Sequence, residues 1–498
     1  MLTTLAAPAF AGTWYIENGD ITVKASDTGN NVTQNNNTTY GDTNTIITGT
    51  SDTNTVTIDT SKGNVDVTFD DLNIDASSRN EAAMSVTGSG NTTIKLDGDN
   101  HLTGGNGRSG IDSIGNLTIY GGENDSLTAK GGSGADGSGG DGIHSGSLTI
   151  YGGTVNANGG NCGDGNYSDG GSGIRISSRS LTIYDGKVNA KGGNGGDGNY
   201  SAGGNGISSS GSITISGGTV DAKGGNSGNG NYSAGGNGID NGGRSGSITI
   251  SGGTVDAKGG NSGTGDYSNG GSGICNGGRS GSITISGGTV NAAGGNDGNG
   301  NYSYGGSGIH SVSGSIDLSG SLELTAKAGS SNGKALSQNG KELDLDTIKD
   351  KLGPGAKVTA TDANGDSKQV SVPRPVEPEK PVIPEESSSS SDGGSAAPSA
   401  PAFPLPGLTV TDKSGAVIDS ISTQSGNTLT VCIGRLTASF RISLAALRQL
   451  RAEGIETITF QTILCSTTLS VDELLAMGGE DAEAVLTHRL TDSSLTVG

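Results

Sequence analysis

The sequence has few of the residues that build a large compact core. Apolar residues occupy 30% of the 498 positions and aromatic residues 3%, whereas ordinary proteins are about 45–50% apolar. This shortage excludes the thick hydrophobic core of a typical enzyme of this length. Proline is scarce, with 11 residues, and glycine follows no every-third-residue phase, so collagen is excluded. No apolar run approaches the roughly 18 residues of a membrane-spanning helix.

Positive charge is also in short supply. The chain has 29 Lys and Arg against 50 Asp and Glu, a formal net charge of −21 and a pI of about 4.5. Because this charge would repel nucleic acid and anionic membranes, we expect neither as a partner. Val, Ile and Leu nevertheless recur at regular intervals, which argues against disorder.

Glycine is abundant, with 94 residues, and much of it belongs to a repeat. The motif LTIYGG or ITISGG recurs every 31 to 35 residues. Its first apolar residue is found at Leu117, Leu148, Leu181, Ile213, Ile248, Ile283 and Ile316. Self-similarity at this period predicts a solenoid, in which each repeat forms one coil.

One repeat shows how a coil is built. Ile213 and Ile215 alternate with polar residues, and so do Val220 and Ala222, which predicts two strands joined by a glycine corner. After a Gly-rich loop, Ile239 starts a third short strand. Burying three large aliphatic side chains yields about 1.5–3 kcal/mol each, whereas ordering a residue costs about 1–2 kcal/mol. A single coil therefore cannot fold alone, and we predict eight to eleven stacked coils.

The predicted fold is all-β, a right-handed parallel β-helix followed by a linker and a small α+β module. We expect right-handedness because parallel crossovers have that hand. The segment 68–106 and units such as GSITISGGTVDAKGGNSG resemble secreted bacterial carbohydrate-binding β-helix proteins with GTITINGGTVTATGG-type repeats, near the pectate-lyase-like superfamily. The resemblance covers about residues 12–329 and implies secretion and binding of a polysaccharide. Longer loops of the GNYSAGGNGI type replace the short AGIGGG of that family.

In-register coils would align equivalent outward residues in columns. One column reads Asn156, Asn189, Asp221, Asp256 and Asn291, and the column two residues on reads Asn158, Lys191, Lys223, Lys258 and Ala293. We interpret Asn189, Asp221, Asp256, Lys223 and Lys258 as candidate glycan-binding residues. The alternative is that such side chains bond only to their own neighbours.

Five tyrosines recur in step with the coils. Tyr167, Tyr200, Tyr232, Tyr267 and Tyr302 are spaced by 32 to 35 residues, which predicts a row. Since the face of an aromatic ring attracts the C–H bonds of a pyranose, the row is a candidate sugar platform. The alternative is that the rings pack over the glycine backbone and shield the loops.

The same loops contain candidate calcium ligands. Asp164, Asp169 and Asp197 lie among oxygen-bearing residues at alternate positions, as in calcium loops. Arg175 stands where such a loop would place Glu, and equivalent loops begin with the uncharged Asn229, Thr264 and Asn299. We therefore expect no cofactor, keep calcium as the alternative, and interpret these oxygens as solvated turn residues.

Nothing in the sequence indicates one catalytic spot. Charged residues recur in every coil, and no GxSxG, HExxH or phosphate-binding loop occurs. The four histidines His101, His144, His310 and His488 are scattered, and two of them belong to a column that we interpret as an exposed turn: Asp112, His144, Arg175, Ser208, Asp240, Cys275 and His310. We therefore expect a non-enzyme that binds an extracellular polysaccharide, such as a host or cell-wall glycan. An adhesin or structural stalk is the alternative, and a polysaccharide lyase is the third.

The remaining segments frame the repeat. We expect a signal-peptide remnant over 1–11, cleaved after Ala11 because Ala9-Phe10-Ala11 fits an A-x-A site; an ordinary disordered N-terminus is the alternative. We expect an N-terminal cap and first coils over 12–92, the repeat β-helix over 93–330 and a C-terminal cap with a helix at 343–352 over 331–371. A Pro/Ser-rich linker over 372–407 precedes the module at 408–498. The protein should be secreted or at the cell surface, and monomeric.

The C-terminal module has ordinary composition. We predict strands at 408–411, 428–433, 437–442 and 457–463, and helices capped by Ser443 and Ser470. Cys432 and Cys465 fall on predicted strands, so an exported protein would pair them in a disulfide, with two buried thiols as the alternative. Cys162 and Cys275 should lie about three coils apart, too far to bridge.

Overall fold

The structure is a computed structural model in which two compact units divide between Pro375 and Val376. It describes residues 11–135, 137–374, 407–411, 420–425, 427–433, 438–462, 466–479, 482–488 and 493–498. Residues 1–10 of the predicted signal-peptide remnant, most of the predicted linker (375–406) and Cys465 lie outside the described residues.

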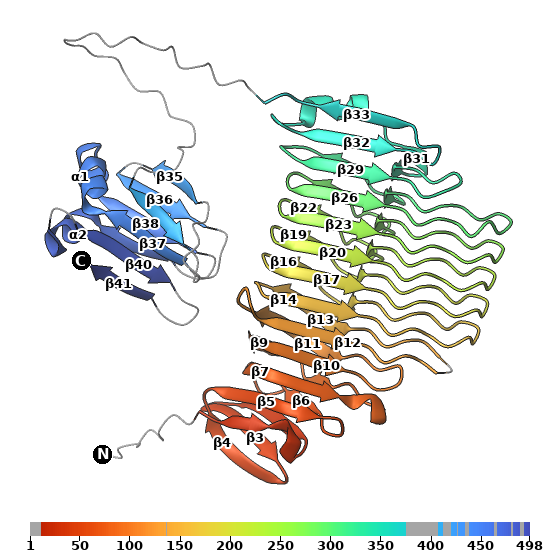
Figure 1. The fold of residues 1–498 in the computed structure, drawn as a ribbon, viewed down its shortest axis with the longest axis horizontal. Helices are drawn as coiled ribbons and strands as arrows, with labels where there is room; N and C mark the ends of the chain where they lie inside the picture. Colours follow the sequence, from red (N-terminus) through yellow and green to blue (C-terminus); the bar gives the residue numbers. More distant parts are fainter. Residues whose placement is uncertain are drawn as a thin grey trace. The chain divides into compact units, whose positions relative to one another are not determined.

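The first unit is a parallel β-solenoid of about 12 turns (Figure 1). This is slightly more than the eight to eleven coils predicted, and the first strand begins at Thr13, in the segment expected to hold the cap and first coils. Its strands form three ladders. The first contains β1(Thr13–Tyr15), β5(Thr45–Ser51), β7(Val65–Asp75), β9(Asn91–Asp97), β11(Ile111–Tyr120), β13(Ile143–Ile150), β16(Leu181–Ile183), β19(Ile213–Ile215), β22(Ile248–Ile250), β25(Ile283–Ile285) and β28(Ile316–Leu318).

The second ladder follows the glycine corner of each coil. It contains β10(Asp99–Thr103), β12(Ser126–Lys130), β14(Thr154–Asn158), β17(Lys187–Lys191), β20(Thr219–Lys223), β23(Thr254–Lys258), β26(Thr289–Ala293), β29(Glu323–Lys327) and β32(Lys357–Thr361). The third ladder follows the Gly-rich loop. It contains β6(Val56–Asp59), β8(Met84–Thr87), the first halves of β11 and β13, β15(Ile174–Ile176), β18(Ile207–Ser209), β21(Ile239–Asn241), β24(Ile274–Asn276), β27(Ile309–Ser311) and β30(Leu336–Gln338).

Neighbouring coils pair in register, as the repeat predicts. Ile213 pairs with Leu181 in the preceding coil and with Ile248 in the next. The inward side chains Ile213, Val220 and Ile239 are completely buried. Each coil thus adds a thin layer of aliphatic side chains to a continuous axial core, which is why so apolar-poor a chain can fold.

The Gly-rich loops are an ordered part of the stack. The Gly193 N–H donates to Gly171 O, the Gly204 N–H to Gly193 O, and the Gly225 N–H to Gly204 O, each at 2.8 Å. This zigzag joins the two arms of one loop to each other and joins each arm to an arm of a neighbouring loop. A Cβ on Gly225 would lie 1.9 Å from the Gly193 carbonyl oxygen. Glycine is therefore required here by close backbone approach, since Gly225 lacks a positive φ.

Antiparallel strands close both ends of the stack. At the N-terminal end β2(Ile21–Ser26), β3(Gly29–Gln34) and β4(Asn37–Asp42) form a meander, beside short turns η1(Ile16–Asn18) and η2(Ala76–Ser78). At the other end β31(Lys341–Glu342) pairs with β30, and β33(Ser367–Ser371) pairs with β32. These strands cover ladder edges to which further strands could otherwise add.

The prediction of a helix over 343–352 is wrong, because no α-helix forms there. The segment forms two 3-10 turns, η3(Leu345–Thr347) and η4(Lys349–Lys351). Its apolar residues Leu345, Ile348 and Leu352 are buried as the spacing suggested. Gly353 N–H donates to Gly320 O at 2.8 Å, so the chain returns to the stack before a longer helix can form.

In the part of the second unit that the structure describes, there are two four-stranded sheets and two helices. One sheet comprises β34(Leu408–Thr411), β37(Ala438–Ser443), β40(Glu483–His488) and β41(Ser493–Val497); the other comprises β35(Ile421–Ser425), β36(Thr428–Cys432), β38(Thr457–Gln461) and β39(Ser466–Ser470). Helices α1(Leu444–Ala452) and α2(Val471–Met477) begin at the predicted caps Ser443 and Ser470. Phe440 and Phe460 pack in its core, 4.9 Å apart. Strands β35, β39 and β40 were not predicted.

Replacing Gly225 by Ala tests the close packing of the loops. Because the new Cβ would meet a backbone oxygen, we expect Gly225→Ala to lower the free energy of unfolding by about 1–3 kcal/mol. Gly137→Ala is the matched control, since a Cβ at Gly137 meets nothing within 4 Å. Urea denaturation of both variants gives the comparison, and equal midpoints would show that the glycine contacts are not required.

Candidate functional site

The predicted polar columns lie on the second ladder. Asn189, Asp221 and Asp256 are consecutive register partners, and so are Lys223 and Lys258. Asn189 Nδ2 donates to Asn156 Oδ1 at 2.7 Å, so part of this column bonds to itself. Lys223 Nζ lies 2.6 Å from Asp221 Oδ2. As a partly exposed ion pair it adds little stability, but it cancels charge on this face.

The five predicted tyrosines form a continuous stack at the tips of the Gly-rich loops. Tyr167, Tyr200, Tyr232, Tyr267 and Tyr302 stack with ring centroids 4.9–5.0 Å apart and interplanar angles of 3–11°. We call these residues the tyrosine row. Each has a positive φ of 57–62°, which is uncommon for a residue other than glycine. The Tyr200 N–H donates to Asn231 O in the next coil at 2.9 Å, so coil pairing holds this unusual turn.

Stacking limits what the row offers to a ligand. Each inner ring has a neighbouring ring on both faces, and 46–49% of each inner residue remains exposed. The end residues Tyr167 and Tyr302 are 73% and 67% exposed, because each has one ring neighbour. The row therefore presents ring edges and hydroxyl groups along its length, and a free ring face only at its ends.

A second tyrosine stack was not predicted. Tyr120, Tyr151 and Tyr184 follow the first ladder, with centroids 4.8 and 4.9 Å apart. Burial raises the pKa of Tyr120 and of Tyr151 above the usual value. The signal was in the sequence, because the motif itself carries tyrosine at one position in three successive coils.

The calcium candidates bond to neighbouring coils. The backbone N–H of Asp197 donates to Asp164 Oδ1 at 3.2 Å, that of Asn229 to Asp197 Oδ1 at 2.9 Å, and that of Ala202 to Asp169 Oδ1 at 2.8 Å. These carboxylates thus join one loop tip to the next. Within the described residues, no group of three or more His, Cys, Asp or Glu side chains is placed to hold a metal ion.

The column interpreted as an exposed turn is instead a strand ladder, so that interpretation was wrong. Asp112 pairs in register with His144, and His144 with Arg175, on the third ladder. From β15 onward the strands of this ladder have only three residues, and β11 and β13 join it through three residues each, which is too few for a periodic signal in the sequence. Several of their outward side chains are half-buried, and Cys275 is buried.

This ladder brings four ionisable side chains of neighbouring coils into contact in two pairs. His144 Nδ1 lies 2.8 Å from Asp112 Oδ1, and Arg175 lies 3.6 Å from the buried carboxylate of Asp141. The hydrogen bond to Asp112 raises the pKa of His144, and the same bond lowers the pKa of Asp112. Burial raises the pKa of Asp141, although Arg175 opposes this effect.

The described cysteines are free thiols. Cys162 and Cys275 are unpaired, as predicted from their separation. Burial raises the pKa of Cys275. Cys432 also carries a free thiol, whose Sγ lies 3.5 Å from Gln461 Oε1. The partner predicted for Cys465 is thus a free thiol, and Cys465 itself lies outside the described residues.

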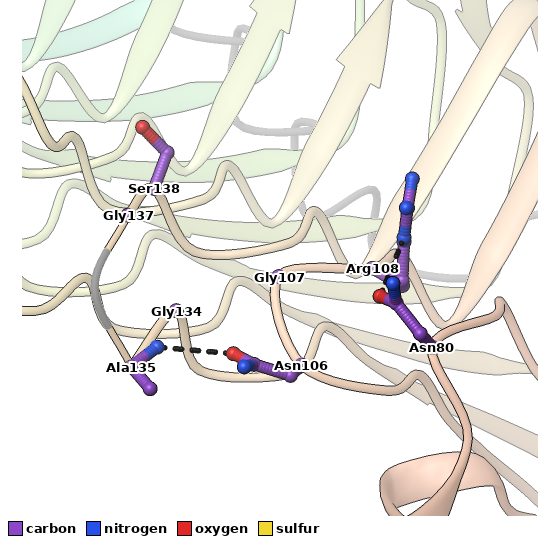
Figure 2. A pocket seen from close by; sticks show the side chains of 8 residues that line it. All are labelled: Asn80, Asn106, Gly107, Arg108, Gly134, Ala135, Gly137 and Ser138. Carbon is purple, nitrogen blue, oxygen red and sulfur yellow. Dashed lines mark hydrogen bonds between the residues drawn. The ribbon is translucent and has the colours of Figure 1, made fainter.

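Two open hollows lie near the N-terminal coils. Figure 2 shows one of about 400 Å³, where Arg108 Nε donates to Asn80 Oδ1 at 3.1 Å and the Ala135 N–H donates to Asn106 Oδ1 at 3.0 Å. The other, of about 430 Å³, is lined by Glu17, Thr50, Ser51, Asp52, Thr53, Asn54, Asn73 and Asp75.

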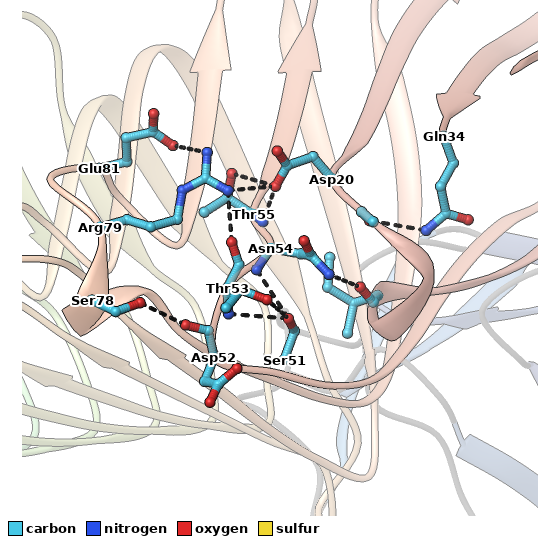
Figure 3. Close-up of polar contacts among 12 residues, drawn as sticks. Asp20, Gln34, Ser51, Asp52, Thr53, Asn54, Thr55, Ser78, Arg79 and Glu81 are labelled. Atoms are coloured by element: carbon cyan, nitrogen blue, oxygen red, sulfur yellow. Dashed lines mark hydrogen bonds and ion pairs between the residues drawn. The ribbon is translucent and has the colours of Figure 1, made fainter. Parts of the chain in front are cut away.

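A polar network joins the coils beside the second hollow. In Figure 3, Arg79 bridges Asp20 and Glu81 at 2.8 Å each and donates to Thr53 O at 2.7 Å. These bonds connect segments distant in sequence. We interpret the network as structural.

Comparison of the chain with protein-family models, with curated proteins and with solved structures gave no match. Among the described residues, no helix combines the length and apolar character needed to cross a membrane.

The His144–Asp112 pair predicts a pH dependence of stability. Because the pKa of His144 is raised in the folded protein, protonated His144 contributes to the free energy of unfolding. This contribution is complete below about pH 6.5, the usual pKa of histidine, and is lost as pH rises through the raised pKa. The pKa of Asp112 is lowered in the folded protein, so ionised Asp112 also contributes to the free energy of unfolding. This second contribution is present above about pH 3.9, the usual pKa of aspartate, and is lost as pH falls through the lowered pKa. The pair should therefore stabilise most between these two usual values.

The measurement is thermal denaturation of wild type and His144→Asn at pH values inside this window and on both sides of it. NMR gives the pKa of His144 in wild type. We expect the difference in melting temperature to be largest inside the window and to shrink on both sides. A difference that does not change with pH would contradict the ion pair.

Proposed function

We propose that the solenoid is a non-catalytic surface that binds an extracellular polysaccharide, in a monomeric protein that is secreted or held at the cell surface. The observation that supports this proposal is the tyrosine row: five exposed rings stand at one regular spacing along the loop tips. A regularly spaced array of edges and hydroxyl groups suits a polymer that repeats its own hydroxyl groups.

The surroundings of the row support a glycan over other polymers. The loop tips carry amide, hydroxyl and carboxylate groups with almost no aliphatic side chains, so a ligand would be bound by hydrogen bonds and ring contacts. The net charge of −21 opposes nucleic acid.

The second candidate is an adhesin or structural stalk without sugar specificity. It is favoured by the hydrogen bonds that polar side chains make between coils. Asn189 Nδ2 donates to Asn156 Oδ1, and the Asn229 N–H donates to Asp197 Oδ1. On this alternative the columns serve only to hold the coils together. The two candidates differ in whether removing the rings affects binding or only stability.

Replacing the inner rings separates the two candidates. The variant Tyr200→Asn/Tyr232→Asn/Tyr267→Asn removes three rings, and Asn tolerates the positive φ better than most residues. We expect glycan binding to weaken about tenfold or more while the melting temperature changes little.

The measurement is a glycan array followed by calorimetry with the glycan that binds wild type best. Tyr40→Asn is the matched control, because Tyr40 is 74% exposed and lies outside both stacks. A triple variant that melts far lower, yet binds as wild type does when folded, would overturn the platform and favour the stalk.

A further inference from the structure

The shorter tyrosine stack ends abruptly inside the solenoid. Tyr184 stacks on Tyr151, and the next coil carries Ser216 at the equivalent position. The register is unambiguous, because Ile183 pairs with Ile215 immediately before these two residues. The Tyr184 N–H donates to Ile150 O and the Ser216 N–H to Ile183 O, as equivalent residues of successive coils do. Ser216 thus occupies the place where a fourth ring would continue the stack.

This step leaves one ring face of the stack without a ring neighbour. Tyr151 has a ring on each side, and burial raises its pKa, whereas Tyr184 has a ring on one side only and is 38% exposed. Ser216 is exposed and is followed by Gly217. A Cβ on Gly217 would lie 2.4 Å from the Tyr184 carbonyl oxygen, so the coil beyond the ring has no room for a larger residue there.

We propose that the free face of Tyr184 and the hydroxyl group of Ser216 form a binding site for one pyranose unit of a glycan, which stacks as the fourth ring of the column. The site rests on the proposed function and adds a contact distinct from the tyrosine row. A pyranose is flat enough to stack on an aromatic ring, and its C–H bonds meet the negative face.

The serine column beyond Tyr184 favours a sugar as the ligand of this site. It continues as Ser216, Ser251, Ser286 and Ser319, so the position next to the free ring face and the same position in each following coil carry a hydroxyl group. These groups match a hydroxyl-rich chain. An aromatic side chain from a protein partner would satisfy the ring face but none of the serines.

The sharpest test fills the site without deleting anything. Ser216→Tyr adds the fourth ring at a position where three preceding coils already carry tyrosine, so the variant should fold and melt at or above the wild-type temperature. It covers the face of Tyr184, and we expect about tenfold weaker binding. Tyr184→Ser should weaken binding to the same extent.

The matched control is Ser251→Tyr, the same substitution one coil further on. It leaves the Tyr184 face and Ser216 unchanged, and its own ring would lie on the far side of the bound sugar. We expect binding equal to or tighter than that of wild type. Calorimetry with cellohexaose, xylohexaose, mannohexaose and chitohexaose gives the affinities, and thermal melting reports folding.

The outcomes separate this site from the proposed function. If wild type binds a hexasaccharide and the tyrosine-row variant weakens it, but Ser216→Tyr binds normally, the Tyr184 site is overturned and the proposed function stands. If Ser216→Tyr and Ser251→Tyr weaken binding equally, added bulk is responsible and the site is also overturned. If wild type binds none of the four hexasaccharides, both the Tyr184 site and the proposed function are overturned for these glycans.

Discussion

In-register backbone pairing between coils is the constraint on which the rest of the structure depends. Every coil donates N–H groups to its neighbour at the same places, in the strand ladders and in the Gly-rich loops. The tyrosine rings therefore repeat at 4.8–5.0 Å, which is the spacing that parallel strands impose. Any residue that recurs in the sequence becomes a member of a column, and its properties depend on its neighbours above and below.

Repetition of the coils reduces the number of groups that are available to a ligand. Equivalent side chains satisfy one another: ring faces cover ring faces, the Asn189 amide bonds to Asn156, and the Asp197 carboxylate accepts from the next coil. The groups left for a ligand are those on the rim of a column or at its end. Free ring faces therefore occur where repetition stops, at Tyr167, Tyr302 and Tyr184. Irregular places in a regular solenoid are the ones to search for sites.

Much of the fold could be predicted because alternation and spacing determine register. The strands around Ile213 and Val220, the polar columns and the tyrosine row all follow from these two properties. Other features leave no such trace. A glycine needed for close approach, such as Gly225, looks the same in the sequence as one in a flexible loop. The half-buried strand position of His144 was missed because only three residues of β13 belong to the third ladder and the outward residues of this column vary, so the sequence shows no period there.

The distribution of charge bears on which glycan the surface suits. Two carboxylates in register at neighbouring coils, as at Asp221 and Asp256, repel each other by about 1 kcal/mol at 4 Å in water and by more near a protein surface. The sequence offsets this repulsion with Lys223 and Lys258 two residues further along, and Lys223 contacts Asp221 directly. The second ladder thus carries charged groups but little local net charge along these coils. Together with the uncharged serine column beyond Tyr184, this makes a neutral polymer a better match for the proposed polysaccharide ligand than a charged one.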